Sequence, residues 1–215
     1  MKIDAIIFDL DGTLVDSSDG VLESFAGAFE TCGVAPTSSL TPDIIGPPLL
    51  CALRALAGTE DASIIEPLAA AFKSYYDEIG YRATKSYSGV SEMLQRLTQG
   101  HRPVFVATNK RKKPTDAIMG MLNWSRYFQE VYALDSLCPP ALTKGALISY
   151  ILSTYKLPPE RTLYVGDRED DFLAATEAGV QFYRATWGYG DCSIYESADG
   201  GIKKLMALLD IVTEI

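Results

Sequence analysis

The second half of the chain alternates between short apolar runs and longer segments whose apolar residues recur at helical spacing. The apolar runs predict strands at 103–108, 131–134, 162–165 and 180–183, and the helical patterns predict helices at 90–97, 114–122, 147–154, 172–177 and 203–212. Strands joined through helices lie parallel, because each crossover returns the chain to the edge where the previous strand began. The alternation therefore predicts an α/β fold: a Rossmann-like, doubly wound parallel sheet with helices on both faces.

One more strand is predicted at residues 3–8, which are too continuously apolar for a strand half exposed to solvent. It is followed by Asp9, Asp11 and the turn residue Gly12. Ligands of open parallel sheets bind at the carboxyl ends of the strands, so both acids stand where a ligand would bind. Neighbouring carboxylates repel each other and are stabilised by a cation or a shared proton. The alternative is a turn in which Asp and Gly serve only the local backbone.

Residues 16–84 show helical spacing and no convincing strand pattern. Apolar stripes predict helices at 21–32, 49–57 and 64–75, and the first is followed by Gly33, a residue typical of helix ends. A length of 215 residues suits one core that carries an insertion. We predict a core of residues 1–15 and 85–215 and an all-helical insertion of residues 16–84.

Composition excludes several classes of function. The formal net charge of -9 leaves no basis for neutralising phosphates along a duplex, so no nucleic-acid partner is expected. No stretch suits a membrane span or a signal peptide, so we expect a cytoplasmic protein without a membrane partner, as a monomer or homodimer. The four cysteines lack the spacing of a zinc site. His101 is the only histidine and lies in a predicted turn, which disfavours a Ser-His-Asp hydrolase.

Polar residues follow the predicted strands or open the next helix. They are Asp9, Asp11, Thr108, Asn109, Lys144, Asp167, Asp170 and Asp171. Carboxylate oxygens are ligands that a hard cation such as Mg²⁺ prefers, and hydroxyl, amide and ammonium groups donate to phosphate oxygens. The set predicts a site for a metal ion and a phosphoryl group at one edge of the sheet.

These residues resemble the motifs of the haloacid-dehalogenase-like superfamily of phosphohydrolases. The sequence DLDGTL at 9–14 matches the first motif, Thr108 the second, Lys144 the third, and GDREDD at 166–171 the fourth, GDxxxD. The resemblance covers essentially the whole chain, because the family inserts a helical cap directly after the first motif. The segments IGPPL at 45–49 and WGYG at 187–190 are similar to the phosphoglycolate-phosphatase-like branch.

The resemblance implies a role for each residue. Asp9 is expected to attack phosphorus and Asp11 to move protons to and from the leaving alcohol and water. Thr108, Asn109 and Lys144 are expected to bind the phosphoryl oxygens. The implied Mg²⁺ ligands are Asp9, the Asp11 backbone carbonyl, and Asp167, with Asp171 nearby or acting through water.

The implied activity is that of a Mg²⁺-dependent phosphomonoester hydrolase, working through an aspartyl-phosphate on a small metabolite such as phosphoglycolate or a sugar phosphate. Alternatives on the same scaffold are a phosphosugar mutase, a pyrophosphatase, or a catalytically silent binding or regulatory protein. A dehalogenase is disfavoured, because that chemistry does not use the acid at position 11.

Several points stay open at the level of sequence. Asp171 is preferred to Asp170 near the metal because it keeps the four-residue spacing from Asp167. The basic run at 110–113 is interpreted as a solvated loop, or as cations that face the mouth of the site and attract an anionic substrate. The turn at 46–48 is a loop that selects substrate or a break between helices. Asp16 is interpreted as a turn or capping acid.

Overall fold

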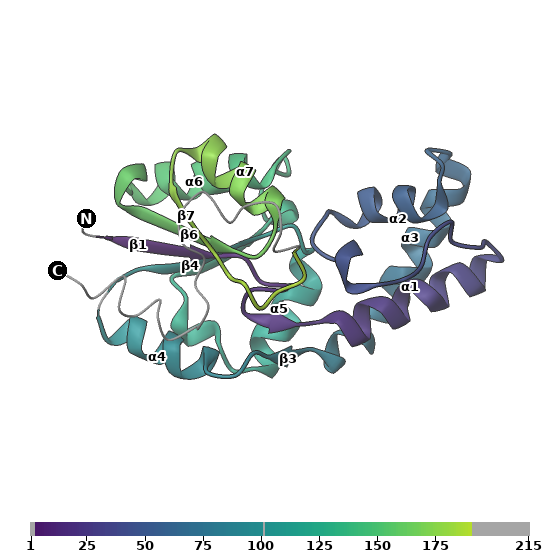
Figure 1. The fold of residues 1–215 in the computed structure, drawn as a ribbon, viewed down its shortest axis with the longest axis horizontal. Coiled ribbons are helices and arrows are strands. Elements are labelled where there is room, and N and C mark those ends of the chain that lie inside the picture. Colours follow the sequence, from purple (N-terminus) through teal and green to yellow (C-terminus); the bar gives the residue numbers. More distant parts are fainter. Residues whose placement is uncertain (1–2, 101, 191–215) are drawn as a thin grey trace.

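The computed structural model describes residues 3–100 and 102–190. The helix predicted at 203–212, His101 and Cys192 lie outside these residues. The described chain forms a sheet flanked by helices, and a separate group of helices lies at one end of it (Figure 1). No helix of the described chain has both the length and the apolarity needed to cross a membrane.

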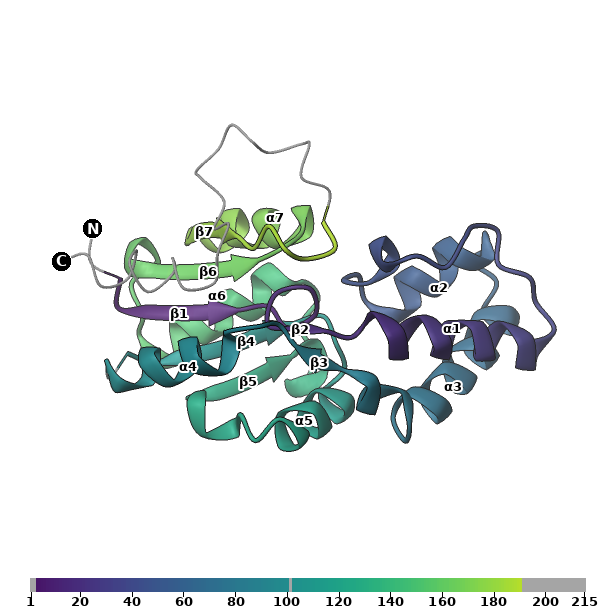
Figure 2. The same ribbon diagram turned by 60° about the horizontal axis from the view of Figure 1, so that its bottom comes forward.

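The sheet has five parallel strands in the order β5-β4-β1-β6-β7 (Figure 2). Their bounds are Ala5–Phe8 for β1, Val104–Thr108 for β4, Glu130–Ala133 for β5, Thr162–Gly166 for β6 and Gln181–Arg184 for β7. The central strands β1, β4 and β6 are buried along their whole length, which explains their unbroken apolar sequences. The predicted α/β fold with a parallel sheet is confirmed.

Helices cover both faces of the sheet. α4 (Val90–Gln99) and α5 (Lys112–Met121) pack on one face, and α6 (Lys144–Tyr155) and α7 (Glu169–Ala178) pack on the other (Figure 1). The side chains of β1 alternate between the two layers: Ile6 and Phe8 lie in the core under α4 and α5, and Ile7 lies in the core under α6. Three short 3₁₀ turns connect these elements, at Ser125–Tyr127, Leu134–Ser136 and Pro159–Arg161.

The helical insertion contains α1 (Ser18–Cys32), α2 (Leu49–Ala57) and α3 (Ala62–Tyr76), with 3₁₀ turns at Pro42–Ile44 and Gly80–Ala83. It has a hydrophobic core of its own, in which the Phe25 and Phe72 rings lie 4.6 Å apart between centroids. The inward face of α3 differs from the predicted stripe by one position: Ile65 and Tyr76 are buried, whereas Ile64 and Tyr75 are only partly buried. The all-helical character of this core was predicted correctly.

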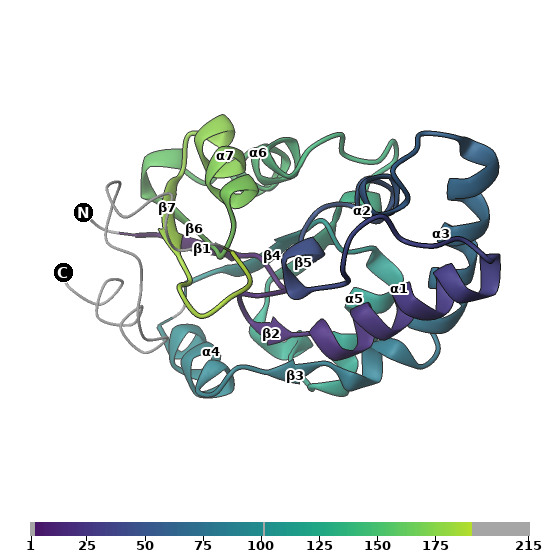
Figure 3. The same ribbon diagram turned by 45° about the vertical axis from the view of Figure 1, so that its right-hand side comes forward.

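Two short strands were missed. Val15–Asp16 (β2) pairs antiparallel with Lys85–Ser86 (β3), where the chain leaves the sheet for the insertion and where it returns (Figure 3). The expectation of no strand in this region was therefore wrong at its boundary. Strands of two residues are too short to show an alternating pattern in sequence.

Candidate active site

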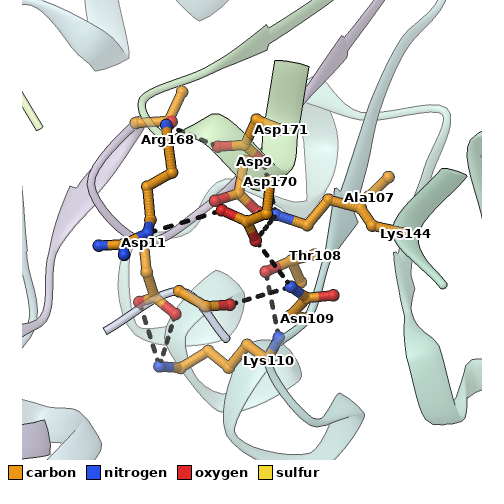
Figure 4. A network of polar contacts seen from close by, with 12 residues as sticks. Asp9, Asp11, Ala107, Thr108, Asn109, Lys110, Lys144, Arg168, Asp170 and Asp171 are labelled. Atoms are coloured by element: carbon orange, nitrogen blue, oxygen red, sulfur yellow. Dashed lines mark hydrogen bonds and ion pairs between the residues drawn. The ribbon is translucent and has the colours of Figure 1, made fainter. Parts of the chain in front are cut away.

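The predicted site residues converge at the carboxyl ends of β1, β4 and β6, on the side of the sheet that faces the insertion (Figures 1 and 4). Asp9 follows β1, Asn109 follows β4, and Asp167 follows β6. Figure 4 shows polar contacts that connect Asp9, Asp11, Thr108, Asn109, Lys110, Lys144, Arg168, Asp170 and Asp171. Side chains from distant parts of the chain thus form one polar cluster, as the parallel topology requires.

Three buried acids form the centre of this cluster. Asp9, Asp167 and Asp171 can each place a carboxylate oxygen within 4.8 Å of the others. Burial raises the pKa of Asp9 well above its ordinary value, the Lys144 charge opposes this, and the neighbouring acids raise it further. Burial, followed by the charge of Asp171, raises the pKa of Asp167 to about 7. Carboxylate groups that are buried close together despite their mutual repulsion are typical of a divalent-cation site.

The contacts of Asp9 also fit a cation. Its Oδ1 is buried and has no hydrogen-bond donor among the described residues. The Lys144 Nζ lies 3.2 Å away as an ion pair, without the geometry of a hydrogen bond. An acceptor that is buried and lacks a donor is destabilising unless a ligand or ion completes it.

Lys144 is the first residue of α6 and is 5 % exposed. Burial lowers the pKa of this ammonium, but the charges of Asp171, Asp9 and Asp170 outweigh that effect and raise the pKa above its ordinary value. Lys144 therefore stays charged, and its ammonium offsets part of the repulsion among the acids.

Asp171 holds this arrangement together. Its Oδ1 accepts hydrogen bonds from Lys144 at 2.5 Å and from the Tyr164 hydroxyl at 3.1 Å. Its Oδ2 accepts from the backbone N–H groups of Asp167 and Arg168, at 3.1 and 3.0 Å. With both oxygens engaged, Asp171 lies in the acid cluster mainly as a residue that positions Lys144 and the start of α7. Asp170 is not part of the described three-acid cluster.

Asp11 points away from the three acids. Its Oδ1 accepts from Ser17 Oγ at 2.6 Å, and the Lys110 ammonium lies 3.1 and 3.0 Å from its two oxygens. Gly12, which follows Asp11 in a turn and has φ of +82°, lies against Asp167, so that a Cβ there would collide with that carboxylate. The two acids of the first motif thus face different neighbours.

The basic run at 110–113 is not a solvated loop. Lys110 contacts Asp11 and lies over the Tyr76 ring, 4.6 Å from its centroid, so one cation does face the site. Arg111 forms a two-point ion pair with Asp77 of the insertion. Lys112 and Lys113 lie in the first turn of α5 and do not line the pocket between cap and core that Lys110 and Arg111 line.

Carboxylates offset the unfavourable position of these cations at a helix start. Lys112 pairs with Asp116 on the surface of α5, and Lys113 pairs with Glu78. The sequence prediction missed these partners because Asp77 and Glu78 lie more than thirty residues away along the chain.

The turn at 46–48 reaches the site. The Asn109 side-chain amide donates to the Gly46 carbonyl at 3.0 Å and to Asp170 Oδ2 at 3.2 Å. Gly46 has φ of +122°, and a Cβ at this position would collide with the Arg168 side chain. Thr108 is buried, and its Oγ1 accepts from the Lys110 backbone N–H at 3.2 Å, which leaves its hydroxyl proton free to donate.

A family model described as haloacid dehalogenase-like hydrolase matches residues 6–185. The chain belongs to this family. Like its relatives in the family, this haloacid dehalogenase-like hydrolase carries a helical cap, formed by α1–α3.

Named relatives of this hydrolase differ in their described activities. The tyrosine-protein kinase PtkA of Mycobacterium tuberculosis is 30% identical over 210 residues, which cover 97% of this chain and 71% of that protein. A phosphoglycolate phosphatase of Rhodobacter capsulatus is 32% identical over 190 residues, covering 86% of this chain and 85% of the relative. A solved haloacid dehalogenase-like family hydrolase from Streptococcus pneumoniae superimposes with a TM-score of 0.84 at 28% identity, covering 97% of this chain and 98% of that one.

Several supporting residues of the hydrolase were not predicted. The Thr13 hydroxyl donates to Asp167 Oδ1 at 3.3 Å, and the Tyr189 N–H donates to Asp167 Oδ2 at 2.7 Å. The Tyr189 hydroxyl contacts Asp16 and accepts from the Ser17 N–H, at 2.8 Å in both cases. Asp16 accepts from Ser18, as a turn acid should. Thr13 and Tyr189 lie in the DLDGTL and WGYG segments noted in the sequence, and Tyr164 is a polar group inside an apolar strand, but no role was predicted for these three.

Proposed function

We propose that the chain is a Mg²⁺-dependent phosphomonoester hydrolase that acts on a small phosphorylated metabolite through an aspartyl-phosphate on Asp9. The observation that carries this proposal is the pairing of a buried carboxylate at Asp9 with an ammonium at Lys144 3.2 Å away. The buried Thr108 belongs to the same polar network (Figure 4). A phosphoryl group at this position would have a nucleophile on one side and donors for its oxygens on the other.

The metal would be held by Asp9, Asp167 and the Asp11 backbone carbonyl, with Asp171 nearby or acting through water. When bound, Mg²⁺ supplies positive charge that offsets the charge of the transferring phosphoryl group. The three-acid cluster and the incompletely paired Asp9 oxygen support this assignment.

Asp9 and Asp11 have different roles in the reaction: Asp9 is the nucleophile, and Asp11 transfers protons. An Asp9 oxygen attacks phosphorus, the bond from phosphorus to the leaving oxygen breaks, and Asp11 gives its proton to the departing alkoxide. Water then attacks the aspartyl-phosphate, Asp11 takes a proton from that water, and Asp9 leaves as inorganic phosphate forms. Thr108, Asn109 and Lys144 bind the phosphoryl oxygens throughout.

The proposal includes the division of the chain into a core of residues 1–15 and 85–215 and a cap of residues 16–84. The pairing of β2 with β3 at these boundaries supports it. The cap covers the carboxyl edge of the sheet, where it can exclude water from the reacting phosphoryl group.

The test is Mg²⁺-dependent release of phosphate from acetyl phosphate and a chromogenic aryl phosphate. Asp9→Asn is expected to abolish turnover, and Asp11→Ala to lower kcat by roughly 10²–10⁴-fold. Asp19→Asn, which removes an exposed acid that pairs with Lys85, serves as the matched control and should keep full activity. A folded wild-type protein that releases no phosphate with Mg²⁺ would instead favour a silent binding or regulatory protein.

A further inference from the structure

A second compartment adjoins the phosphoryl site on its cap side. Asp11, Asn109 and Lys110 form its floor, and its walls come from all three cap helices and the turn before α2. The wall side chains are predominantly apolar: Val21, Phe25, Ile45, Leu49, Ala52 and Phe72. Because Asp11 must reach the leaving oxygen, the group beyond that oxygen would extend into this compartment.

The cations that line this compartment already have partners. Lys110 contacts both oxygens of Asp11 and lies against the Tyr76 ring. Burial lowers the pKa of Lys110, but Asp11 and then Tyr76 outweigh that effect and raise it above its ordinary value. Arg111 forms its two-point ion pair with Asp77, whose side chain is 8 % exposed. Lys110 and Arg111, the two cations that line the compartment among the described residues, each pair with a carboxylate. Arg168, which packs against Gly46 of the wall, pairs with Asp170 at 3.6 Å.

A second anionic group on the substrate would therefore meet an apolar wall and the Asp11 carboxylate. Burying an unpaired carboxylate in apolar surroundings is strongly unfavourable, whereas an alkyl or aryl group gains from the same burial. The Phe25 and Phe72 rings are tilted at 44° with centroids 4.6 Å apart, and the Phe72 and Tyr76 rings stack at 5.4 Å. An aromatic substrate group would extend this row of rings.

We infer that the substrate of this site is a phosphate monoester whose alcohol carries an uncharged, apolar or aromatic group and no second anion. The inference rests on the proposed function, because it requires the phosphoryl group to lie at Asp9. It selects against a phosphoglycolate-like substrate, whose carboxylate would enter the apolar compartment without a cationic partner.

The test compares two esters with the same leaving atom, benzyl phosphate and 4-carboxybenzyl phosphate, with acetyl phosphate as a substrate too small to reach the apolar walls. The wild-type protein is expected to show a kcat/KM at least about tenfold higher for benzyl phosphate. Leu49→Arg adds a cation to the wall and should shift the preference toward the carboxylated ester. Leu50→Arg adds the same charge at the next residue, which is 42% exposed and does not line the compartment, and should leave the ratio unchanged.

Equal efficiency with the two benzyl esters, or preference for the carboxylated one, overturns the inference and leaves the proposed function standing. So does hydrolysis of acetyl phosphate with neither benzyl ester accepted. Failure with all three substrates overturns the proposed function itself. Thermal unfolding of both variants shows that they are folded, and the wild-type ratio decides the question even if Leu49→Arg does not fold.

Discussion

Asp170 lies among donors and cations that could instead bind a phosphoryl anion. The Asn109 amide donates to its carboxylate at 3.2 Å, Lys144 Nζ lies 3.9 Å from it, and Arg168 Nε lies 3.6 Å from it. These are the kinds of groups that bind a phosphoryl anion. The side chain of Asp170 is 40% exposed, so its carboxylate can move aside into solvent. Asp170 thus occupies donors that a bound phosphate would use.

Removing this charge should strengthen phosphate binding. We expect Asp170→Asn to lower the inhibition constant of inorganic phosphate about three- to tenfold, because the phosphate no longer competes with a carboxylate for the same donors. Competitive inhibition of aryl phosphate hydrolysis measures this constant. Asp116→Asn, which removes an exposed acid of α5, is the control and should leave the constant unchanged. A constant that is equal or higher in Asp170→Asn would contradict this role.

The gathering of these polar residues at one edge of the sheet could be predicted because they stand at fixed places relative to strands. Asp9, Thr108 and Asp167 each end or follow an apolar run, and this placement alone brought them together. The orientation of Asp11 could not be predicted, since it depends on Ser17 and on Lys110, 99 residues away. Local sequence patterns do not reveal polar contacts between residues that lie far apart along the chain.

The turn between the Pro42–Ile44 3₁₀ helix and α2 joins the cap to the core over the site. Its Gly46 carbonyl accepts from Asn109, and its backbone lies directly against Arg168. A glycine is needed here on two grounds: φ of +122° is rarely adopted by other residues, and a Cβ has no room. Close contact between cap and core at this turn therefore depends on the absence of one methyl group.

Gly46→Ala should destabilise the protein by about 1–3 kcal/mol and raise KM, because alanine is strained at this φ and the added methyl group displaces the turn or the Arg168 side chain. Gly27→Ala should change the free energy of unfolding in the opposite direction. Gly27 lies within α1 with no atom within 4 Å of an added Cβ, so alanine should stabilise the helix by about 0.5–1 kcal/mol without changing KM. Chemical denaturation and steady-state kinetics measure both effects. Equal stability changes in the two variants would rule out close packing at Gly46.

At the level of elements, periodicity predicted the strands and helices that bury a continuous face. It misplaced the inward face of α3 by one residue, because the adjacent pairs Ile64–Ile65 and Tyr75–Tyr76 allow an apolar stripe on either of two neighbouring faces. It also placed the start of α5 two residues late, at Pro114 instead of Lys112. Proline is favoured near helix starts, so the sequence shows where a helix can begin and not how many residues precede the proline.

Across the whole molecule, the acid cluster makes folding sensitive to pH when no metal is bound. The folded-state pKa of Asp9 and of Asp167 lies above the ordinary value of 3.8, and for Asp167 it reaches about 7. At pH values between the ordinary pKa and the raised folded-state pKa, the folded chain therefore binds more protons than the unfolded chain. A carboxyl group with a raised pKa favours the folded state below the unfolded pKa, and this contribution is lost as the pH rises toward the folded pKa.

We therefore expect the free energy of unfolding of the metal-free protein to fall between about pH 4 and about pH 7. Mg²⁺ should restore stability at the upper end of this range, where the acids are ionised and able to bind it. Urea denaturation in chelator and in Mg²⁺ measures both effects. Asp167→Asn removes one of the titrating groups and should flatten the profile. The expectation is wrong if the variant and the wild-type protein lose stability equally over this range.

The pairing of β2 with β3 has a consequence for how such a molecule can diversify. Val15 pairs with Ser86 and Asp16 with Lys85, so the two ends of a long insertion are neighbours. Whatever lies between them can be lengthened, shortened or exchanged at little cost in loop-closure entropy, because that cost grows only with the logarithm of length. The sheet and its acids need not change when this happens. In this way the residues at the carboxyl edge of the sheet can stay unchanged during evolution while the inserted segment that covers them varies.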